Sequence, residues 1–272
     1  MKNSLKKLKK EIEKIPLLRS HHGSHLKDLP LIQAFMGKHS EKSKKNLKED
    51  VMTPENLKAN NDDHEKHKQL HKEMGQHYAI HDHEDDARIL HYTDESQDLN
   101  HYLHKKEQLK QKGEEYHSQH YEDYSKGLQK ALMKHKTPHE LTVYSGLRYS
   151  PEDLFDKYGK RKGSHVVVNH PAFLSTSISK HIANKFSKHD PYSDYISRKT
   201  AGQDRSHHML KIHIPKGHPG AYIAHRSFVP NEKEFLLPHH TKLSIERTPE
   251  HDSEAGTYVW HAHVLPHEED HD

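Results

Sequence analysis

The sequence changes character at Pro138, and this change most constrains the fold. Before Pro138, long polar stretches carry apolar residues at helical spacing, whereas afterwards short apolar runs are separated by Gly, Pro and Ser. We expect strands at residues 141–144, 166–168, 172–174, 209–214, 221–223, 234–237, 242–247 and 258–265. Helices first and strands afterwards favour an α+β fold over an alternating, doubly wound one.

The part before Pro138 predicts three helical stretches. Apolar residues between Ala79 and Tyr92 can line one helical face, and Thr93 to Ser96 offer N-cap chemistry for a second helix through Leu103. A third helix is expected from Tyr116 to Lys134, with Pro138 following it as a stop.

Charge divides the chain into an arm and a domain. Residues 1–50 carry 13 Lys+Arg against 6 Asp+Glu, whereas residues 250–272 carry 7 acids and no Lys or Arg. We interpret residues 1–60 as a basic, largely flexible arm with a short helix over Leu5 to Ile15. Residues 61–272 then form one domain with a core at about 79–265.

Composition excludes several classes of protein. Hydrophobic residues make up only 31% of the 272, no run approaches 18 apolar residues, and Met1 to Ser4 lead into lysines, so we expect neither a membrane span nor a secretory signal. The absence of cysteine excludes disulfides, Cys zinc sites and thiol nucleophiles. A reducing cytoplasm fits this, and so does a virus particle.

The 33 histidines raise the question of a metal site. His64, His67 and His71 fall on one helical stripe, and His261 and His263 share a strand face. His81 and His83 flank Asp82 in the same His-rich region. No His-Glu-x-x-His motif occurs, and histidines are scattered through every segment, so we favour a compositional bias on solvated faces over a metal site. Solubility or packing should then respond to pH between about 5 and 7.

Four segments, in order, resemble the ADP-ribosyltransferase exoenzyme family, the toxin-like group of the Arg-Ser-Glu class. They are Ile89 to Leu103 with its Tyr-Thr and Asn, Leu141 to Leu147 with Thr-Val-Tyr-Ser-Gly, Phe173 to Ser177 with Ser-Thr-Ser, and Asn231 to Pro238 with Glu-x-Glu. Each segment alone is weak, but their order and spacing together are specific. The resemblance implies N-terminal helices followed by two packed, mainly antiparallel sheets around a cleft for NAD+, which is the substrate.

The Glu-x-Glu pair is the predicted catalytic centre. Cleaving the nicotinamide–ribose bond builds positive charge on the ribose, which a carboxylate stabilises. By resemblance, Glu234 hydrogen-bonds the ribose 2′-hydroxyl, and Glu232 orients or deprotonates the incoming nucleophile. Alternate residues of a strand point to one side, so we expect Glu232 and Glu234 to face one cleft and Lys233 to face away.

Further site residues follow from the same resemblance. Ser175 resembles the serine that positions the catalytic glutamate, while for Thr176 and Ser177 backbone pairing at the strand end is a better interpretation than ligand contact. Phe186 resembles an aromatic under the nicotinamide, although an aromatic on a helix is more often core. Phe228 is the candidate for touching the protein acceptor, with inward packing as the alternative.

The family arginine that grips the NAD+ pyrophosphate is absent from its usual place. Ser145 stands there, next to Gly146, and Arg148 is three residues on. A strand reverses its face over an odd shift, so Arg148 can substitute only if Gly146 bulges or the strand ends there. Otherwise NAD+ is held by backbone and the remaining polar groups.

The resemblance leads to a prediction of function with two alternatives. We expect a mono-ADP-ribosyltransferase acting on a host protein, with arginine as the acceptor because Glu-x-Glu is the form linked to arginine transfer. One alternative is an NAD glycohydrolase or an inactive relative of the same fold. The other is a virion-packaged, His-rich protein that binds nucleic acid or metal through its basic and histidine-rich regions.

The residue patterns of these segments most resemble those of enzymes of tailed bacteriophages that modify host proteins. The acceptor would then belong to the transcription or translation machinery, and the protein would act in the host cytoplasm after delivery, packaged in the virion. Prohead proteases of such phages cut after Leu/Ile-x-Glu, and Leu47-Lys48-Glu49 fits that pattern. We therefore expect removal of the arm after Glu49.

Overall fold

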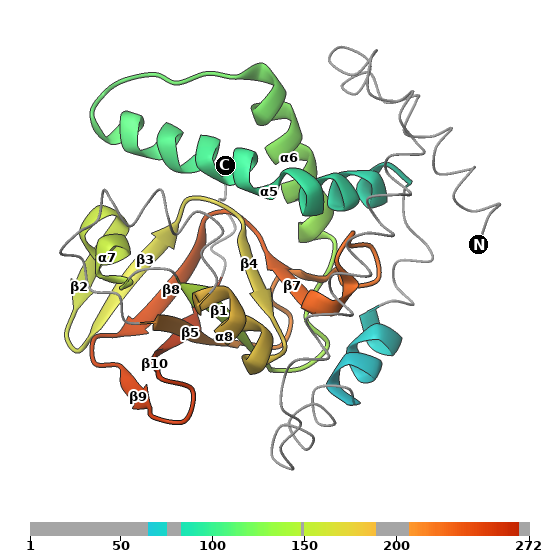
Figure 1. Cartoon of the computed structure of the whole chain (residues 1–272). Coiled ribbons are helices and arrows are strands. Elements are labelled where there is room, and N and C mark those ends of the chain that lie inside the picture. The colour runs from blue at the N-terminus through green and yellow to red at the C-terminus, as the bar shows by residue number, and fades with distance from the viewer. Residues whose placement is uncertain (1–64, 75–82, 148–149, 189–206, 267–272) are drawn as a thin grey trace.

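A computed structural model describes residues 65–74, 83–147, 150–188 and 207–266 of the chain. The predictions for the arm 1–60, which include the helix over Leu5 to Ile15 and cleavage after Glu49, lie outside the described residues. In Figure 1, two long helices lie along one side of a twisted β-structure.

The helical part comprises a helix over residues 65–74, α5 (His83–Gln111) and α6 (Gln119–Met133). The two helices expected between residues 79 and 103 lie end to end within α5 and meet at a kink at Glu95, where the backbone is not helical (φ −111°, ψ 19°). The kink lies within Thr93 to Ser96, where we expected the second helix to begin. The apolar face of α6 is buried as its spacing predicted, with Tyr124, Leu128 and Leu132 in the core.

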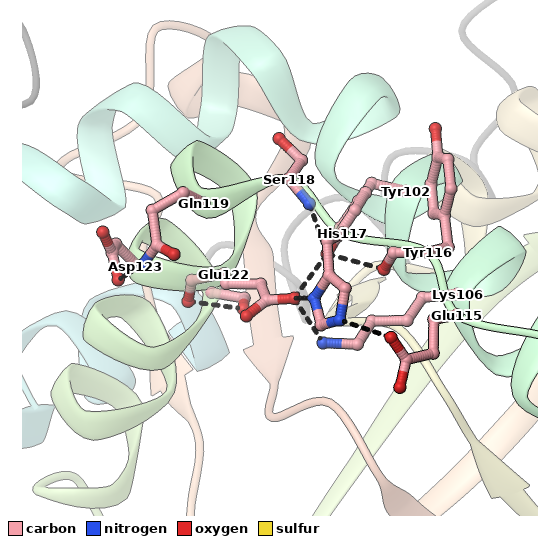
Figure 2. Close-up of polar contacts among 10 residues, drawn as sticks. Tyr102, Lys106, Glu115, Tyr116, His117, Ser118, Gln119, Glu122 and Asp123 are labelled. Carbon is pink, nitrogen blue, oxygen red and sulfur yellow. Dashed lines mark hydrogen bonds and ion pairs between the residues drawn. The ribbon is translucent and has the colours of Figure 1, made fainter.

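A cluster of polar side chains joins α5 to α6 (Figure 2). One carboxylate oxygen of Glu122 accepts hydrogen bonds from the Tyr102 hydroxyl (3.0 Å), Lys106 Nζ (2.9 Å) and His117 Nδ1 (3.0 Å). These contacts hold the pKa of Glu122 down to about 2.

The strand order of the sheet is β2-β3-β8-β10-β5-β1-β4-β7-β6, with β9 paired to β10. Only the β10–β5 pair runs parallel among the strands that the structure describes. The strands are β1 (Leu141–Leu147), β2 (Gly159–Lys162), β3 (His165–His170), β4 (Leu174–Ser177), β5 (His207–Ile214), β6 (Ala221–Tyr222), β7 (Glu234–Leu237), β8 (Thr241–Glu246), β9 (Glu250–Asp252) and β10 (Thr257–Val264).

The α+β class is confirmed. The two sheets that we expected are joined by hydrogen bonds into one continuous sheet. The junction lies between β1 and β4, which pair in register only at Tyr144 and Ser177. It separates a larger part of the sheet, from β2 to β1, from a smaller part made of β4, β7 and β6. The two strands at this junction carry Ser145 and Ser175.

Three short elements complete the fold around this junction. They are α7 (Glu152–Tyr158), α8 (Lys180–Lys188) and the 3-10 helix η2 (Pro230–Glu232). α8 packs against β1, and η2 leads directly into β7.

The core begins earlier than residue 79, where we expected it to start. Leu70 and Met74 of the helix over residues 65–74 are both 3% exposed and belong to the main apolar cluster. Two apolar residues in an otherwise polar helix gave too weak a signal to be recognised. Within the described residues, no helix is both long and apolar enough to cross a membrane.

Candidate active site

A cleft of about 610 Å³ lies at the junction of the two parts of the sheet. A volume of this size suits a small-molecule ligand. It is lined by Tyr92, Thr93, Asp94, Glu95, Ser96, Gln97, Asp98, Tyr144, Ser145, Gly146, Ser175, Thr176, Ser177, Phe186, Val229, Glu232 and Glu234. The kink of α5, the ends of β1 and β4, α8 and the turn before β7 therefore meet here.

Glu234 is the first residue of β7 and pairs with Ser177 of β4. Its side chain is buried, with 7% of the residue exposed, and it forms a hydrogen bond with the Ser175 side chain. Burial and the nearby charge of Glu232 raise the pKa of Glu234 to about 8, while the Ser175 hydrogen bond lowers it. A carboxyl held between these opposing effects is typical of a functional site.

Glu232 reaches the same cleft, but the strand geometry that we expected is wrong. It ends the 3-10 helix η2, and Lys233 then adopts a left-handed conformation (φ 48°, ψ 46°) before β7 begins at Glu234. The left-handed residue turns the chain so that both carboxylates line one cleft, without strand alternation. Burial raises the pKa of Glu232 to about 7.

The end of β4 holds this segment in place. Ser177 Oγ donates to the Glu232 carbonyl oxygen (2.7 Å), and Thr176 Oγ1 donates to the Phe235 carbonyl oxygen (2.6 Å). The backbone N–H of Ile178 donates to the Lys233 carbonyl oxygen (3.2 Å). Both hydroxyl groups thus pair with backbone, which was the preferred interpretation, although Thr176 and Ser177 also line the cleft.

Ser175 and Ser145 meet across the junction. Ser175 is exposed on the cleft, and its carbonyl oxygen accepts a hydrogen bond from Ser145 Oγ (3.1 Å). Ser145 stands where the resemblance implies the family arginine. It is buried, and its hydrogen bond holds Ser175. Arg148 lies outside the described residues, and no Lys, Arg or His from the described part of the chain lines the cleft.

Gly146 allows β1 to approach α8 closely. A Cβ at this position would lie 2.1 Å from the Ala183 carbonyl oxygen and 2.7 Å from the Ser187 backbone nitrogen. The position therefore excludes any side chain.

The two aromatic candidates differ in their placement. Phe186 is 45% exposed and lines the cleft, so the alternative that it is simple core is wrong. Phe228 is half-buried, and its backbone N–H donates to Thr93 Oγ1 (3.2 Å). Its neighbour Val229 lines the cleft and Phe228 does not.

Tyr92 and the acidic residues of α5 were not among the expected site residues. Tyr92 is fully buried, yet its hydroxyl lies 3.0 Å from Ser175 Oγ. Asp94, Glu95 and Asp98 line the cleft near the kink. The signal was present in the Tyr-Thr and Asn pattern, which we used only as a marker of the fold.

Histidines gather away from the cleft in the described residues. His213 of β5 stacks on His263 of β10, with ring centroids 4.9 Å apart. Over the described part of the chain, no group of three or more His, Cys, Asp or Glu side chains is arranged to hold a metal ion.

Comparison with known proteins gives the family of this α+β chain with its cleft. A sequence model described as "ADP-ribosyltransferase exoenzyme" matches residues 38–265, most of the chain. The protein therefore belongs to the ADP-ribosyltransferase exoenzyme family, whose enzymes take NAD+ as substrate.

Among curated proteins, the chain is similar to the NAD(+)–arginine ADP-ribosyltransferase EFV of Enterococcus faecalis. The two are 30% identical over 119 residues, which is 44% of this chain and 20% of that protein. The chain thus spans only a small part of the length of this relative.

Solved structures of several bacterial toxins share the fold. Plx2a, an ADP-ribosyltransferase toxin from Paenibacillus larvae, matches with a TM-score of 0.52 and 20% identity, over 74% of this chain and 96% of that one. C3stau2 from S. aureus, solved with NAD, matches with a TM-score of 0.53 and 17% identity over 74% and 95%. Vis toxin from Vibrio splendidus gives 0.52 and 18% over 80% and 89%.

Proposed function

We propose that the protein is a mono-ADP-ribosyltransferase that transfers ADP-ribose from NAD+ to an arginine of a host protein. The observation that carries this proposal is the placement of Glu232, Glu234 and Ser175 in one cleft of a size that suits a ligand. Membership of the family supports NAD+ as the donor, and the curated relative supports arginine as the acceptor.

Glu234 is the group that stabilises the transition state. As the bond between nicotinamide and the ribose C1′ carbon breaks, its electron pair leaves with nicotinamide and the ribose becomes positively charged. A buried carboxylate near the sugar lowers this barrier because the cleft screens the charge poorly. Glu234 must therefore be ionised when the bond breaks.

Glu232 is the group that acts on the acceptor. A guanidinium becomes a nucleophile as it loses a proton, and a carboxylate with a pKa of about 7 is suited to accept that proton near neutral pH. The new bond joins a guanidinium nitrogen to C1′. Since both carboxyls work deprotonated and the pKa of Glu234 is about 8, transfer should become faster as the pH rises from about 6 to 8.

The proposal is tested with NAD+ labelled on its adenylate part and a bacterial lysate. The wild-type protein should label discrete proteins, and the bond to each should be to arginine by mass spectrometry. Glu234→Ala should label none, and equal labelling by wild type and this variant would refute the mechanism.

A second candidate function is NAD+ glycohydrolysis, in which water replaces the protein acceptor. It is favoured by one observation, since Ser145 occupies the place of the family arginine and is committed to a hydrogen bond with Ser175. Nicotinamide release by the wild-type protein without labelling of any protein would support this alternative.

The phage context adds further proposals that rest on resemblance. The acceptor would belong to the transcription or translation machinery of the host, and the protein would enter the host cytoplasm from the virion. The basic arm, cleaved after Glu49 or intact, suits contact with nucleic acid or an acidic partner. Mass spectrometry of the virion-borne protein tests the cleavage, and an intact Met1 terminus would refute it.

A further inference from the structure

A chain of hydrogen bonds runs from α5 to Glu234. The backbone N–H of Phe173 donates to Asn100 Oδ1 (3.1 Å), and Asn100 Nδ2 donates to the Tyr92 hydroxyl (3.0 Å). That hydroxyl lies 3.0 Å from Ser175 Oγ, and Ser175 hydrogen-bonds Glu234. Tyr92 and Ser175 both line the cleft, and Tyr92 is fully buried.

The direction of these hydrogen bonds is fixed by the backbone. An N–H group only donates, so the Asn100 atom that faces Phe173 is the amide oxygen, and its NH₂ group points to Tyr92. The Tyr92 oxygen is therefore an acceptor toward Asn100, and its proton needs another partner. Over the described residues, Ser175 Oγ is the only acceptor within reach of that proton.

Ser175 is thereby left with one proton to donate, and Glu234 receives it. A serine hydroxyl on its own can rotate and can also accept from a protonated carboxyl. When Ser175 Oγ accepts the Tyr92 proton through one of its two lone pairs, its own proton is directed away from Tyr92 and can be donated to Glu234, and this hydrogen bond favours the ionised carboxylate.

We propose that Tyr92 and Asn100 are positioning residues that order the hydrogen bonds through Ser175, so that Ser175 donates to Glu234, holds its carboxyl in one orientation and favours its ionised form. The part played in catalysis rests on the proposed function, whereas the effect on the ionisation of Glu234 does not. Tyr92 lines the cleft and Asn100 does not, and both act on Glu234 through Ser175.

The electrostatics of the cleft explain why this ordering matters. Glu234 is faced by Glu232 from η2 and by Tyr92 from α5, and the same cleft is lined by Asp94, Glu95 and Asp98. Burial and the charge of Glu232 favour the protonated form of Glu234. Tyr92 stays protonated, because burial and the charge of Glu234 raise its pKa, so it remains a donor over the whole working range.

The side chain of Tyr92 is held by packing as well as by hydrogen bonds. Its ring packs edge-on against Phe173, with centroids 5.6 Å apart, and Phe173 is itself fully buried. Tyr92 and Asn100 lie on either side of the kink at Glu95. The kinked helix α5 thus carries both Tyr92 and Asn100.

The test is a titration of Glu234 by NMR in the full-length protein labelled with ¹³C at glutamate carboxyls, with Glu234→Gln to assign the signal. Wild type should titrate near pH 8. Tyr92→Phe removes the hydroxyl and should move the midpoint about one pH unit higher, which corresponds to one lost hydrogen bond to a charged group. An unchanged midpoint in Tyr92→Phe would overturn the proposal, whether or not the protein is an active transferase.

Tyr124→Phe is the matched control, since Tyr124 is also buried and its hydroxyl donates to the Arg88 carbonyl oxygen (3.0 Å) instead. It should leave the midpoint in place. If it moves the midpoint as far as Tyr92→Phe does, the effect is general loosening and the ordered chain is refuted. Asn100→Asp provides a second variant, because it turns the Tyr92 proton away from Ser175 and should also raise the midpoint.

Kinetics give a readout that loss of folding would not imitate. For nicotinamide release at pH 7, Tyr92→Phe should lower kcat about tenfold with little change in the KM for NAD+, and activity should recover at higher pH. In a Ser175→Ala background, Tyr92→Phe should have no further effect. Additive losses in the double variant would contradict action through Ser175, while an inactive wild type would refute the proposed function alone.

Discussion

Glu232 and Glu234 reach one cleft by different backbone conformations. The sequence pattern identified both residues but predicted a strand for both, and the left-handed Lys233 is what brings Glu232 into the cleft. A left-handed conformation at lysine costs roughly 1–2 kcal/mol and has no sequence signature, so it could not be predicted.

Glu232→Gln should separate the two halves of the reaction. An amide cannot accept the guanidinium proton, so arginine transfer should fall at least about 100-fold. Nicotinamide release should change less than about tenfold, because Glu234 remains. Both rates are measured by chromatography with NAD+ and an arginine analogue.

The matched variant for this test is Glu234→Gln, which should abolish both rates together. An equal loss of transfer and of nicotinamide release in Glu232→Gln would mean that Glu232 acts on NAD+ and not on the acceptor.

Tyr92 and Asn100 show the limit of motif reasoning at this scale. Both were recognised as part of a pattern, yet the contact of Tyr92 with Ser175 joins residues 83 positions apart in the chain. Such contacts depend on how α5 packs on β4, which periodicity does not specify.

Among the elements, the contact between β1 and α8 shapes one wall of the cleft. Gly146→Ala would place a Cβ against the α8 backbone, so the protein should lose about 2 kcal/mol of unfolding free energy. NAD+ cleavage should fall as well, because Phe186 of α8 would shift. Urea denaturation and nicotinamide release measure the two effects.

Gly163→Asn is the control, since nothing lies near that position and asparagine tolerates its φ of +64°. It should change the unfolding free energy by less than about 0.5 kcal/mol. If Gly146→Ala is equally mild, the close packing of β1 on α8 is wrong.

The Glu122 cluster between α5 and α6 should make the stability of the protein sensitive to acid (Figure 2). The pKa of Glu122 in the folded protein is about 2, below the ordinary value of 4.5. The contribution of Glu122 to the free energy of unfolding is therefore complete above about pH 5 and is lost as the pH falls toward 2. Glu122→Gln should flatten the dependence of unfolding free energy on pH in this range, measured by urea denaturation.

Asp123→Asn tests whether that effect is specific, because the hydrogen bond of Asp123 to Gln119 lies within α6 alone. A flattening by Asp123→Asn as large as that by Glu122→Gln would argue against the cluster.

Element by element, the strands were predicted better than their connections. β7 was predicted with its observed limits, and β1, β3, β5, β8 and β10 overlap the expected runs. The strand expected at 172–174 is wrong, because β4 begins only at Leu174, and β2 and β9 were not expected. The helix boundary expected at Thr93 to Ser96 is present as the kink of α5 at Glu95.

For the whole molecule, several histidines are buried and do not lie on solvated faces as we expected. His135, His170, His208 and His218 are each at most 8% exposed. Burial lowers the pKa of His170 and of His225 to about 4, and it lowers the pKa of His104, His213 and His240 as well. The unfolded chain binds protons at these sites near pH 6.5, whereas the folded protein does not. Acid should therefore favour unfolding.

The free energy of unfolding should fall as the pH drops from about 6.5 to 4, and His170 alone should account for about 2–3 kcal/mol of the loss. His170→Asn should reduce this slope, measured by urea denaturation at each pH. The same substitution at the exposed His251 is the control, and an equal effect of both would contradict the role of burial.

The overall architecture was predictable because order and spacing of four segments carry it, and the α+β fold is confirmed by the toxin structures. The start of the core was not predictable, since Leu70 and Met74 are isolated apolar residues in a polar helix. The joining of the two expected sheets at Tyr144 and Ser177 also depends on contacts distant in sequence.

The central claim is that Glu234 drives the cleavage of NAD+ in this cleft. Its most direct test uses purified full-length protein, NAD+ and agmatine as a free guanidine, with mass spectrometry of the products. Wild type should release nicotinamide and form ADP-ribosyl-agmatine, and Glu234→Ala should form neither while folding normally. NAD+ left intact by the wild type, or consumed equally by Glu234→Ala, would contradict the claim.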